Sequence, residues 1–214
     1  MKTAVIAGYS GLIGRQLLDL LLDDDRYSRV IALGRRTLDI ENPKLIQEVV
    51  DFNELNLETE SIDDVFCCLG TTIKKAGSKE QFRLVDFQFP VNLGDYCHKN
   101  GATSFSLVSS MGANSDSFVF YNQVKGEVEK AINNTGYSRV EIYRPSLLLG
   151  LRNESRTAED LGKAFMKGLG FLFVGPLKDY KAIDSLKVAK AMISIVQDEG
   201  TGIHIHSSGE LQNY

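Results

Sequence analysis

Three closely spaced glycines near the start of the chain limit its possible folds more than any other sequence feature. They are Gly8, Gly11 and Gly14. A short apolar run at residues 2–7 precedes them, and apolar residues recur at helical spacing over residues 11–22. A strand that turns through glycines into a helix lets phosphates approach the free N–H groups and positive dipole end of that helix. The three glycines are therefore predicted to bind the pyrophosphate of a dinucleotide.

The remainder of the chain continues this alternation of short apolar runs with helical patterns. Strands are predicted at residues 2–7, 29–33, 45–50, 65–69, 103–109, 139–143 and 202–206. Helices are predicted at residues 11–22, 79–99, 120–133, 158–168 and 184–197. Strands that are apolar nearly throughout and separated by helices indicate a parallel sheet covered on both faces. The predicted fold class is therefore α/β, a Rossmann-like doubly wound parallel sheet.

The domain organisation is expected to be simple. No repeat, low-complexity segment or linker divides the chain, and 214 residues suit one sizeable core. We expect a single NAD(P)-binding Rossmann-type domain over residues 1–214. From about residue 146 onward the alternation loosens, and this part is predicted to form a small substrate-side extension over the cofactor site. Pro90 lies inside a helical pattern and is expected to kink or divide that helix.

Composition and charge exclude several classes of function. Hydrophobic residues make up 43% of the chain and charged residues 24%, which is ordinary for a globular protein. The net charge of −4 argues against a general nucleic-acid surface, which would favour a basic patch. No apolar run approaches the roughly 20 residues that span a bilayer. The predicted partner is a small-molecule substrate, with no nucleic acid and no membrane span, and a protein partner is left open.

The cysteines and histidines are assigned no chemistry. Cys67 and Cys68 are neighbours on a predicted strand and face opposite ways, so a bridge between them is not expected. Buried, reduced cysteines, including Cys97, are typical of a cytoplasmic protein. His204 and His206 share one strand face but have no third ligand nearby in the sequence, so no metal site is predicted.

Two arginines at the end of the second predicted strand indicate which dinucleotide binds. An NAD-specific protein usually has a carboxylate there that accepts hydrogen bonds from the adenosine ribose. This chain has Arg35 and Arg36 instead, and guanidinium groups bind phosphates in a forked geometry. The predicted cofactor is therefore NADP(H), with its 2′-phosphate at these arginines. The alternative is that both arginines only solvate a loop.

Asp51 and Phe52 follow the third predicted strand, where the adenine ring of a dinucleotide would lie. A carboxylate can accept a hydrogen bond from the adenine amino group, and a phenyl ring can pack near the adenine ring. Both residues are therefore predicted to contribute to cofactor binding.

Tyr121 and Lys125 are the candidate catalytic pair. They stand four residues apart at the start of a predicted helix and so share one face. An ammonium beside a phenol stabilises the phenolate, which allows the tyrosine to donate a proton to a carbonyl oxygen. The preceding strand ends in Ser109 and Ser110, which face opposite ways, so one of them can hold the same oxygen. We favour Ser110 because it is nearer the carboxyl end of the strand.

From about residue 5 to residue 156 the chain resembles the atypical short-chain dehydrogenases/reductases, and within them the Tat-interacting-protein group. The most specific stretches are Cys67-Cys68-Leu69-Gly70-Thr71-Thr72, Lys75-Ala76-Gly77, Gln123-Val124-Lys125-Gly126-Glu127-Val128-Glu129 and Arg144-Pro145. The resemblance implies a Rossmann fold that binds NADPH, with Tyr121 as proton donor or acceptor. It implies cofactor contacts from Ser10, Gly11, Leu12, Ile13, Arg35, Arg36, Leu69, Gly70, Tyr121, Lys125, Leu148 and Arg156. Thr71, which lies in the first of these stretches, is counted with them.

Two features depart from the typical pattern of that superfamily. The phosphate loop lacks the form Thr-Gly-x-x-x-Gly-x-Gly, and the spacing from Ser110 to Tyr121 is tighter. The resemblance also includes relatives that act as cofactor-binding regulators. The leading prediction is an NADPH-dependent oxidoreductase that transfers hydride to a small carbonyl-type substrate. The alternatives are an NADP(H)-binding redox sensor or scaffold without turnover, and an isomerase or epimerase.

Overall fold

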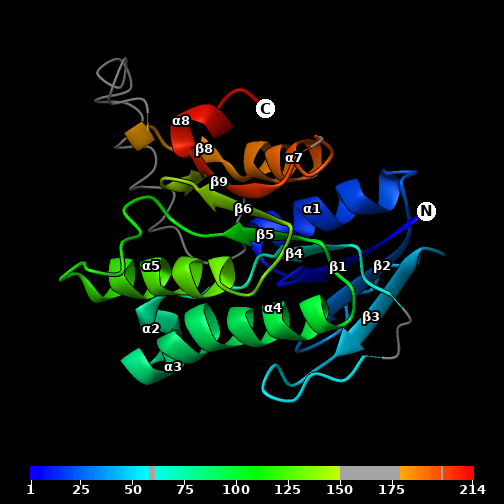
Figure 1. The fold of residues 1–214 in the computed structure, drawn as a ribbon, viewed down its shortest axis with the longest axis horizontal. Helices are drawn as coiled ribbons and strands as arrows, with labels where there is room; N and C mark the ends of the chain where they lie inside the picture. Colours follow the sequence, from blue (N-terminus) through cyan, green and yellow to red (C-terminus); the bar gives the residue numbers. More distant parts are fainter. Residues whose placement is uncertain (58–60, 150–178, 199) are drawn as a thin grey trace.

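The computed structural model describes residues 1–57, 61–149, 179–198 and 200–214. Over these ranges one seven-stranded sheet runs through the centre of the molecule (Figure 1). Its strands are β1 (Lys2–Ala7), β2 (Tyr27–Gly34), β3 (Leu45–Val49), β4 (Asp64–Cys67), β5 (Ser104–Val108), β6 (Arg139–Arg144) and β9 (Gly202–Ser207). A second, two-stranded sheet pairs β7 (Leu148–Leu149) with β8 (Ile183–Asp184).

The large sheet is parallel throughout, in the order β3-β2-β1-β4-β5-β6-β9. In its centre, Val5 of β1 aligns with Ile31 of β2 on one side and Val65 of β4 on the other. All three side chains are buried, as expected for strands that are covered on both faces. The predicted Rossmann-like doubly wound parallel sheet is confirmed.

Helices cover both faces of the sheet (Figure 1). On one face α1 (Leu12–Asp23) packs against α7 (Ser185–Ile195), and on the other α4 (Phe89–Lys99) packs against α5 (Phe120–Asn133). The shorter helices are α2 (Ile73–Ala76), α3 (Lys79–Arg83) and α8 (Ser208–Leu211). Helix α5 has the bounds that the sequence pattern predicted.

Each face of the sheet has its own apolar cluster. The first cluster includes Leu17, Leu21, Val188 and Met192, and the second includes Leu93, Cys97, Val128 and Ile132. These side chains recur every three or four residues along their helices, which is why each helix presents one apolar face to the sheet. Complete burial of one leucine contributes about 1.5–3 kcal/mol.

The helix predicted at residues 79–99 is divided, as Pro90 led us to expect. A π-helical segment, η1 (Leu84–Gln88), separates α3 from α4, and Pro90 lies in the first turn of α4. Proline has no N–H, and its ring conflicts with the carbonyl four residues earlier, which is that of Asp86. The wider π turn relieves this conflict, and such turns are frequent at functional sites. Asp86 is buried within it, next to α5.

The strand order reverses between β1 and β4. The chain moves from β1 outward to β2 and β3, then returns to β4 on the opposite side of β1. Ligands of open α/β sheets bind at the carboxyl ends of the strands at such a point. The loops that follow Ala7 and Cys67 lie there, and both carry predicted cofactor residues.

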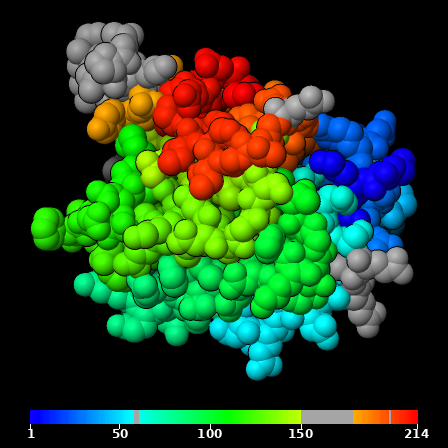
Figure 2. Space-filling model, in the orientation of Figure 1, coloured from blue at the N-terminus to red at the C-terminus, as the bar shows by residue number. Residues whose placement is uncertain are grey.

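The described C-terminal residues add a helix to one face of the sheet and a strand to its edge. Helix α7 begins at the N-cap Asp184, whose side chain accepts a hydrogen bond from the Leu186 N–H, and β9 pairs with β6 at the sheet edge. Figure 2 shows β9 and α8, in orange-red and red, forming one continuous surface with the green and yellow-green residues from the middle of the chain. The helix predicted at residues 158–168 lies outside the described residues, and the predicted substrate-side extension stays a prediction.

Candidate cofactor-binding and active site

The loop from β1 to α1 forms the first part of the site. Gly8 has a φ of 84°, in the left-handed region that favours glycine. A Cβ at Gly8 would lie 2.5 Å from the Cys68 carbonyl oxygen, and one at Gly14 would lie 2.3 Å from the Gly8 carbonyl oxygen. Neither position accepts a side chain unless the backbone moves. The two glycines therefore hold this loop closely between β1, β4 and α1.

The N-terminus of α1 fits an anionic group. Its N-cap residue, Gly11, provides no side-chain cap, and no acidic residue lies in the first turn. The first helical residues are Leu12, Ile13 and Gly14, whose N–H groups have no partner within a helix. Ser10 and Gly11 are exposed in front of them. The residues present therefore fit the pyrophosphate of a dinucleotide.

Arg35 and Arg36 follow β2 at the same edge of the sheet, and both are exposed. The Tyr9 hydroxyl, from the phosphate loop, donates a hydrogen bond of 2.6 Å to the Arg36 carbonyl oxygen. The structure thus brings the predicted pyrophosphate and 2′-phosphate regions together. Tyr9 was not among the predicted residues, although a large aromatic ring inside a glycine-rich loop is an unusual feature.

Asp51 and Phe52 differ in their surroundings. Asp51 is exposed, and its Oδ1 accepts hydrogen bonds from the backbone N–H and side-chain amide of Asn53, at 2.9 and 2.8 Å. Phe52 is only 4% exposed, belongs to the second apolar cluster and stacks on Phe89 with ring centroids 5.4 Å apart. Its ring is therefore packed in the core. The predicted role of both residues near adenine stays a prediction.

The loop after β4 carries Leu69, Gly70 and Thr71 and lies against α5. The Thr71 N–H donates a hydrogen bond of 2.8 Å to Asp86 Oδ2. A Cβ at Gly70 would lie 3.9 Å from Lys125 Nζ and 3.5 Å from Asp86 Oδ1. The structure therefore brings this part of the predicted cofactor site to the candidate catalytic lysine.

Lys125 is buried and paired with Asp86. Its Nζ lies 2.7 Å from Asp86 Oδ1, and the two side chains are 6% and 1% exposed. Burial lowers the pKa of the Lys125 ammonium, but the Asp86 carboxylate raises it, and the pKa lies above its ordinary value. Asp86 was not among the residues predicted from the sequence. Its signal is a carboxylate within the apolar run Leu84-Val85-Asp86-Phe87, four residues before Pro90.

Tyr121 stands one helical turn before Lys125. Its ring packs against Phe82 of α3, with centroids 5.5 Å apart and planes at 38°. The loop after β5 packs closely against the same helix at Gly126, where a Cβ would lie 2.1 Å from the Ser115 nitrogen. Contacts with α3 and with this loop therefore fix the start of α5, which carries Tyr121.

The two serines after β5 have different partners. Ser109 is buried, and its hydroxyl donates a hydrogen bond to Glu129 Oε1. Glu129 also accepts a hydrogen bond of 3.0 Å from Arg144 Nε, so Ser109 belongs to a structural cluster. The Ser110 hydroxyl oxygen is buried and has no hydrogen-bond partner within the described part of the chain. Ser109 is thus engaged with Glu129, whereas the predicted role of Ser110 in the active site stays a prediction.

Two predicted cofactor residues, Leu148 and Arg156, are not placed beside the other predicted cofactor residues by any hydrogen bond or ion pair in the described part of the chain. Leu148 lies in the small β7–β8 sheet and packs against the first apolar cluster. Arg156 lies outside the described residues. Their predicted contacts with the cofactor stay predictions.

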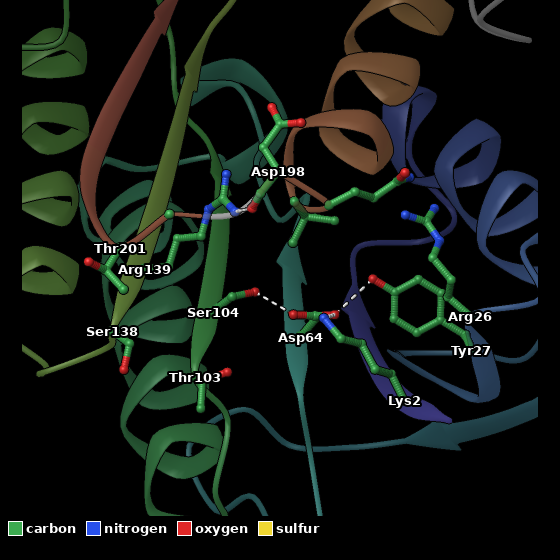
Figure 3. A pocket seen from close by; sticks show the side chains of 13 residues that line it. Lys2, Arg26, Tyr27, Asp64, Thr103, Ser104, Ser138, Arg139, Asp198 and Thr201 are labelled. Atoms are coloured by element: carbon green, nitrogen blue, oxygen red, sulfur yellow. Dashed lines mark hydrogen bonds and ion pairs between the residues drawn. The ribbon is translucent and has the colours of Figure 1, made fainter.

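A cavity of about 260 Å³ adjoins the carboxyl ends of β5, β6 and β9. Its lining includes Met111, Gly112, Arg144, Ser207 and Ser208. Another cavity, of about 390 Å³, lies at the amino ends of the strands (Figure 3). In it, the buried Asp64 carboxylate already accepts hydrogen bonds from Tyr27, Ser104 and Lys2, at 2.9, 2.7 and 2.9 Å. These polar groups hold the opposite edge of the sheet together.

The cysteines and the histidine pair make contacts that support no separate chemistry. Burial raises the pKa of the Cys67 thiol to about 12, so it does not form a reactive thiolate. His204 and His206 both contact Glu141, at 3.1 and 2.6 Å. No group of three or more potential metal ligands is present among the described residues. In the same residues no helix is long and apolar enough to cross a membrane.

Comparison with known sequences shows the family of this chain. The sequence model of the NAD dependent epimerase/dehydratase family matches residues 4–166. Rat protein HTATIP2 is 35% identical over 207 residues, which span 94% of this chain and 84% of that protein. "Protein FMP52, mitochondrial" of Candida albicans is 32% identical over 201 residues, which span 90% of this chain and 86% of that protein.

Solved structures of low sequence identity share the fold. "MoeE5 in complex with UDP-glucuronic acid and NAD" has a TM-score of 0.72 and 16% identity, over 95% of this chain and 75% of that chain. A short chain dehydrogenase family protein from Francisella tularensis has a TM-score of 0.66 and 16% identity, over 98% of each chain.

The fold and site define an NAD(P)-binding protein of the Rossmann class. The chain belongs to the NAD dependent epimerase/dehydratase family, and within it to the HTATIP2-like atypical short-chain dehydrogenases/reductases. A nicotinamide dinucleotide cofactor is typical of this family.

Proposed function

We propose that this protein is an NADPH-dependent oxidoreductase that reduces a small carbonyl-type substrate, with Tyr121 as the proton donor. The observation that carries the proposal is the position of Lys125. Its ammonium lies beside Gly70, at the carboxyl edge of the sheet, and one helical turn from Tyr121. The buried Lys125 thus lies next to a predicted cofactor loop, and Tyr121 precedes it by one turn of the same helix.

Three groups of residues would hold the cofactor. The pyrophosphate would lie against the α1 N-terminus and the loop before it, formed by Gly8, Ser10, Gly11, Leu12, Ile13 and Gly14. The backbone N–H groups of Leu12, Ile13 and Gly14 would donate hydrogen bonds to it. Leu69, Gly70 and Thr71 would line the path toward the nicotinamide. Asp51 and Phe52 are proposed near the adenine. The bound dinucleotide supplies the hydride, and the residues of this chain supply orientation and the proton.

The exposed pair Arg35 and Arg36 supports NADPH over NADH. Both follow β2 directly, at the position where NAD-specific proteins usually have a carboxylate for the ribose hydroxyls. Guanidinium groups attract the doubly charged 2′-phosphate and can donate two parallel hydrogen bonds to it. Some solved structures with this fold contain NAD, but their sequence identity to this chain, 16% and 17%, is too low to transfer a cofactor preference.

The chemical step assigned to this chain is one proton transfer. The Tyr121 hydroxyl would donate its proton to the substrate carbonyl oxygen as that oxygen gains negative charge. The Ser110 hydroxyl would donate a hydrogen bond to the same oxygen. Lys125 would stabilise the phenolate that remains and hold a ribose hydroxyl, while Asp86 keeps the lysine in place.

A second function is favoured by the Lys125–Asp86 pair. Because Asp86 already compensates the ammonium, the charge available to stabilise a Tyr121 phenolate is reduced. A protein that binds NADP(H) tightly and signals to a partner does not need a stabilised Tyr121 phenolate, whereas a fast reductase does. An NADP(H)-binding sensor or scaffold is therefore the alternative. An isomerase or epimerase reaction is the remaining alternative, suggested by the description of the family and by a UDP-N-acetylglucosamine 4-epimerase that shares the fold.

A screen of carbonyl compounds, followed by the loss of NADPH absorbance, separates these functions. The reductase proposal expects a substrate whose turnover disappears in Tyr121→Phe. Tight NADPH binding without turnover of any carbonyl compound would instead support the sensor.

We further propose a cytoplasmic location, on the basis of the free cysteines Cys67, Cys68 and Cys97.

A further inference from the structure

We propose that Tyr9 is a positioning residue for cofactor specificity, because it fixes the loop that carries Arg35 and Arg36 at a set distance from the phosphate loop. This inference rests on the NADPH preference proposed above. It adds a residue that would not touch the 2′-phosphate and yet would control how well the arginines bind it.

The Tyr9 side chain is built into the loop contact. The residue is 1% exposed, and its hydroxyl donates a hydrogen bond of 2.6 Å to the Arg36 carbonyl oxygen. Burial raises the pKa of the Tyr9 phenol, while the nearby Arg36 charge lowers it by less. The phenol therefore remains protonated and acts as the donor.

The end of β2 leaves room for this ring. A Cβ at Gly34 would lie 2.8 Å from Tyr9 Cε1 and 3.4 Å from the Tyr9 hydroxyl oxygen. Any side chain at position 34 would push the ring away from the Arg36 carbonyl. Glycine at this position and tyrosine in the phosphate loop are therefore complementary.

The arginine loop is also held at its far end. Gln47 of β3 accepts a hydrogen bond of 2.7 Å from the Leu38 N–H and donates one of 2.8 Å to the Leu38 carbonyl oxygen. The backbone from Arg36 to Leu38 is thus fixed at two points, by one side chain from the phosphate loop and one from β3. The arginine side chains stay exposed between β2 and the second point. A site organised before its ligand arrives loses less conformational entropy on binding.

The Tyr9 contact differs from the Gln47 contact in what it joins. Tyr9 lies between Gly8 and Ser10 in the loop that would bind the pyrophosphate, and Arg36 belongs to the loop that would bind the 2′-phosphate. One hydrogen bond therefore sets the spacing of two anion-binding regions. NADPH uses both regions and NADH only the first, so removal of the hydroxyl should affect NADPH selectively.

Calorimetric titration of Tyr9→Phe with NADPH and NADH tests this inference. The variant keeps the ring and its packing and removes only the hydroxyl. NADPH affinity is expected to fall about three- to tenfold, the usual effect of one lost hydrogen bond, while NADH affinity stays the same. Gly34→Ala, which displaces the ring, should also lower the ratio of NADPH affinity to NADH affinity.

Tyr137→Phe is the matched control. The buried Tyr137 hydroxyl donates a hydrogen bond of 2.8 Å to the Gly94 carbonyl oxygen, in the second apolar cluster. The control should lose stability without any change in the affinity ratio. The proposed role of Tyr9 is overturned if the NADPH-to-NADH affinity ratio is unchanged in Tyr9→Phe. It is also overturned if Tyr137→Phe lowers this ratio as much as Tyr9→Phe does.

The test also separates this inference from the proposed function. Equal affinities for NADPH and NADH in the unaltered protein contradict the NADPH preference and, with it, a specificity role for Tyr9. A preference that survives Tyr9→Phe overturns only the role of Tyr9. Faster amide hydrogen exchange over residues 35–38 in Tyr9→Phe is the second expected result, and unchanged exchange there contradicts the proposed fixing of the loop.

Discussion

Lys125 and Asp86 form a buried ion pair, with 2.7 Å between Nζ and Oδ1. Asp86 reaches this position from the π-helical segment that precedes Pro90, and its other oxygen accepts the Thr71 N–H. One carboxylate therefore joins the helix that carries Tyr121 to the loop that would line the cofactor. This pair links the stability of the protein to the geometry of its site.

Asp86→Asn should be strongly destabilising, because it leaves the Lys125 ammonium buried without a counter-charge. Loss of one partner from a buried pair costs about 3–5 kcal/mol, which urea unfolding would detect. The double variant Asp86→Asn/Lys125→Met should regain much of the loss, since no charge is then buried. Asp19→Asn, which breaks the exposed contact between Asp19 and Arg15, is the control and should have little effect. Equal losses in Asp86→Asn and Asp19→Asn would contradict the account of the pair.

The same pair predicts how stability depends on alkaline pH. The pKa of Lys125 in the folded protein lies above its usual 10.5. The contribution of the pair is therefore fully present below about pH 10.5 and is lost as the pH rises through the higher folded-state pKa. In Lys125→Met this alkaline loss should be smaller, and an unchanged pH profile would contradict the assignment.

Tyr121→Phe separates catalysis from binding. The variant keeps the ring that packs against Phe82 and removes the group that donates the proton. Turnover of a substrate found by the screen should fall by about a hundredfold or more, as expected when a general acid is lost. NADPH affinity should barely change, because the phosphates and adenine supply most of the binding. Turnover equal to that of the unaltered protein would remove the proposed proton donor.

Gly11→Val tests the phosphate loop. The backbone at Gly11 is extended, with φ −81° and ψ 175°, so valine can adopt it, and its Cβ would lie 3.1 Å from the Gly8 carbonyl oxygen. We expect a modest loss of stability and the loss of NADPH binding, since the side chain would fill the space of the pyrophosphate. In Gly200→Val the Cβ would have nothing within 4 Å, so binding should persist there. Normal NADPH binding by Gly11→Val would show that the phosphates bind elsewhere.

The fold could be predicted because its signals are local. Apolar spacing marked the strands and helices, and Pro90 marked the division of a helix, since its effect acts on the carbonyl four residues earlier. The parallel direction of the strands followed from the rule that buried strands separated by helices form a parallel sheet, whereas the order of the strands was not predicted. These features depend on neighbouring residues and so are visible without a structure.

The partners within the site could not be predicted in the same way. Asp86 meets Lys125 only after a π turn changes the register of the helix, and the two residues are far apart in the sequence. Strand alternation indicated that Ser109 and Ser110 face opposite ways, but the sequence could not show that Ser109 is hydrogen-bonded to Glu129. A phenyl ring suits both a hydrophobic core and the surroundings of an adenine ring. The position of Phe52 in the sequence therefore did not show that its ring packs in the core.

The exposed arginines after β2 are proposed to select NADPH, and calorimetric titration of the unaltered protein with NADPH and NADH tests this selection most directly. NADPH is expected to bind at least about tenfold tighter, which is roughly 1.4 kcal/mol. Arg35→Ala/Arg36→Ala should abolish the difference, whereas Arg29→Ala/Lys99→Ala, which removes the same charge from exposed residues far from the site, should retain it. Equal affinities, or tighter binding of NADH by the unaltered protein, would contradict the claim.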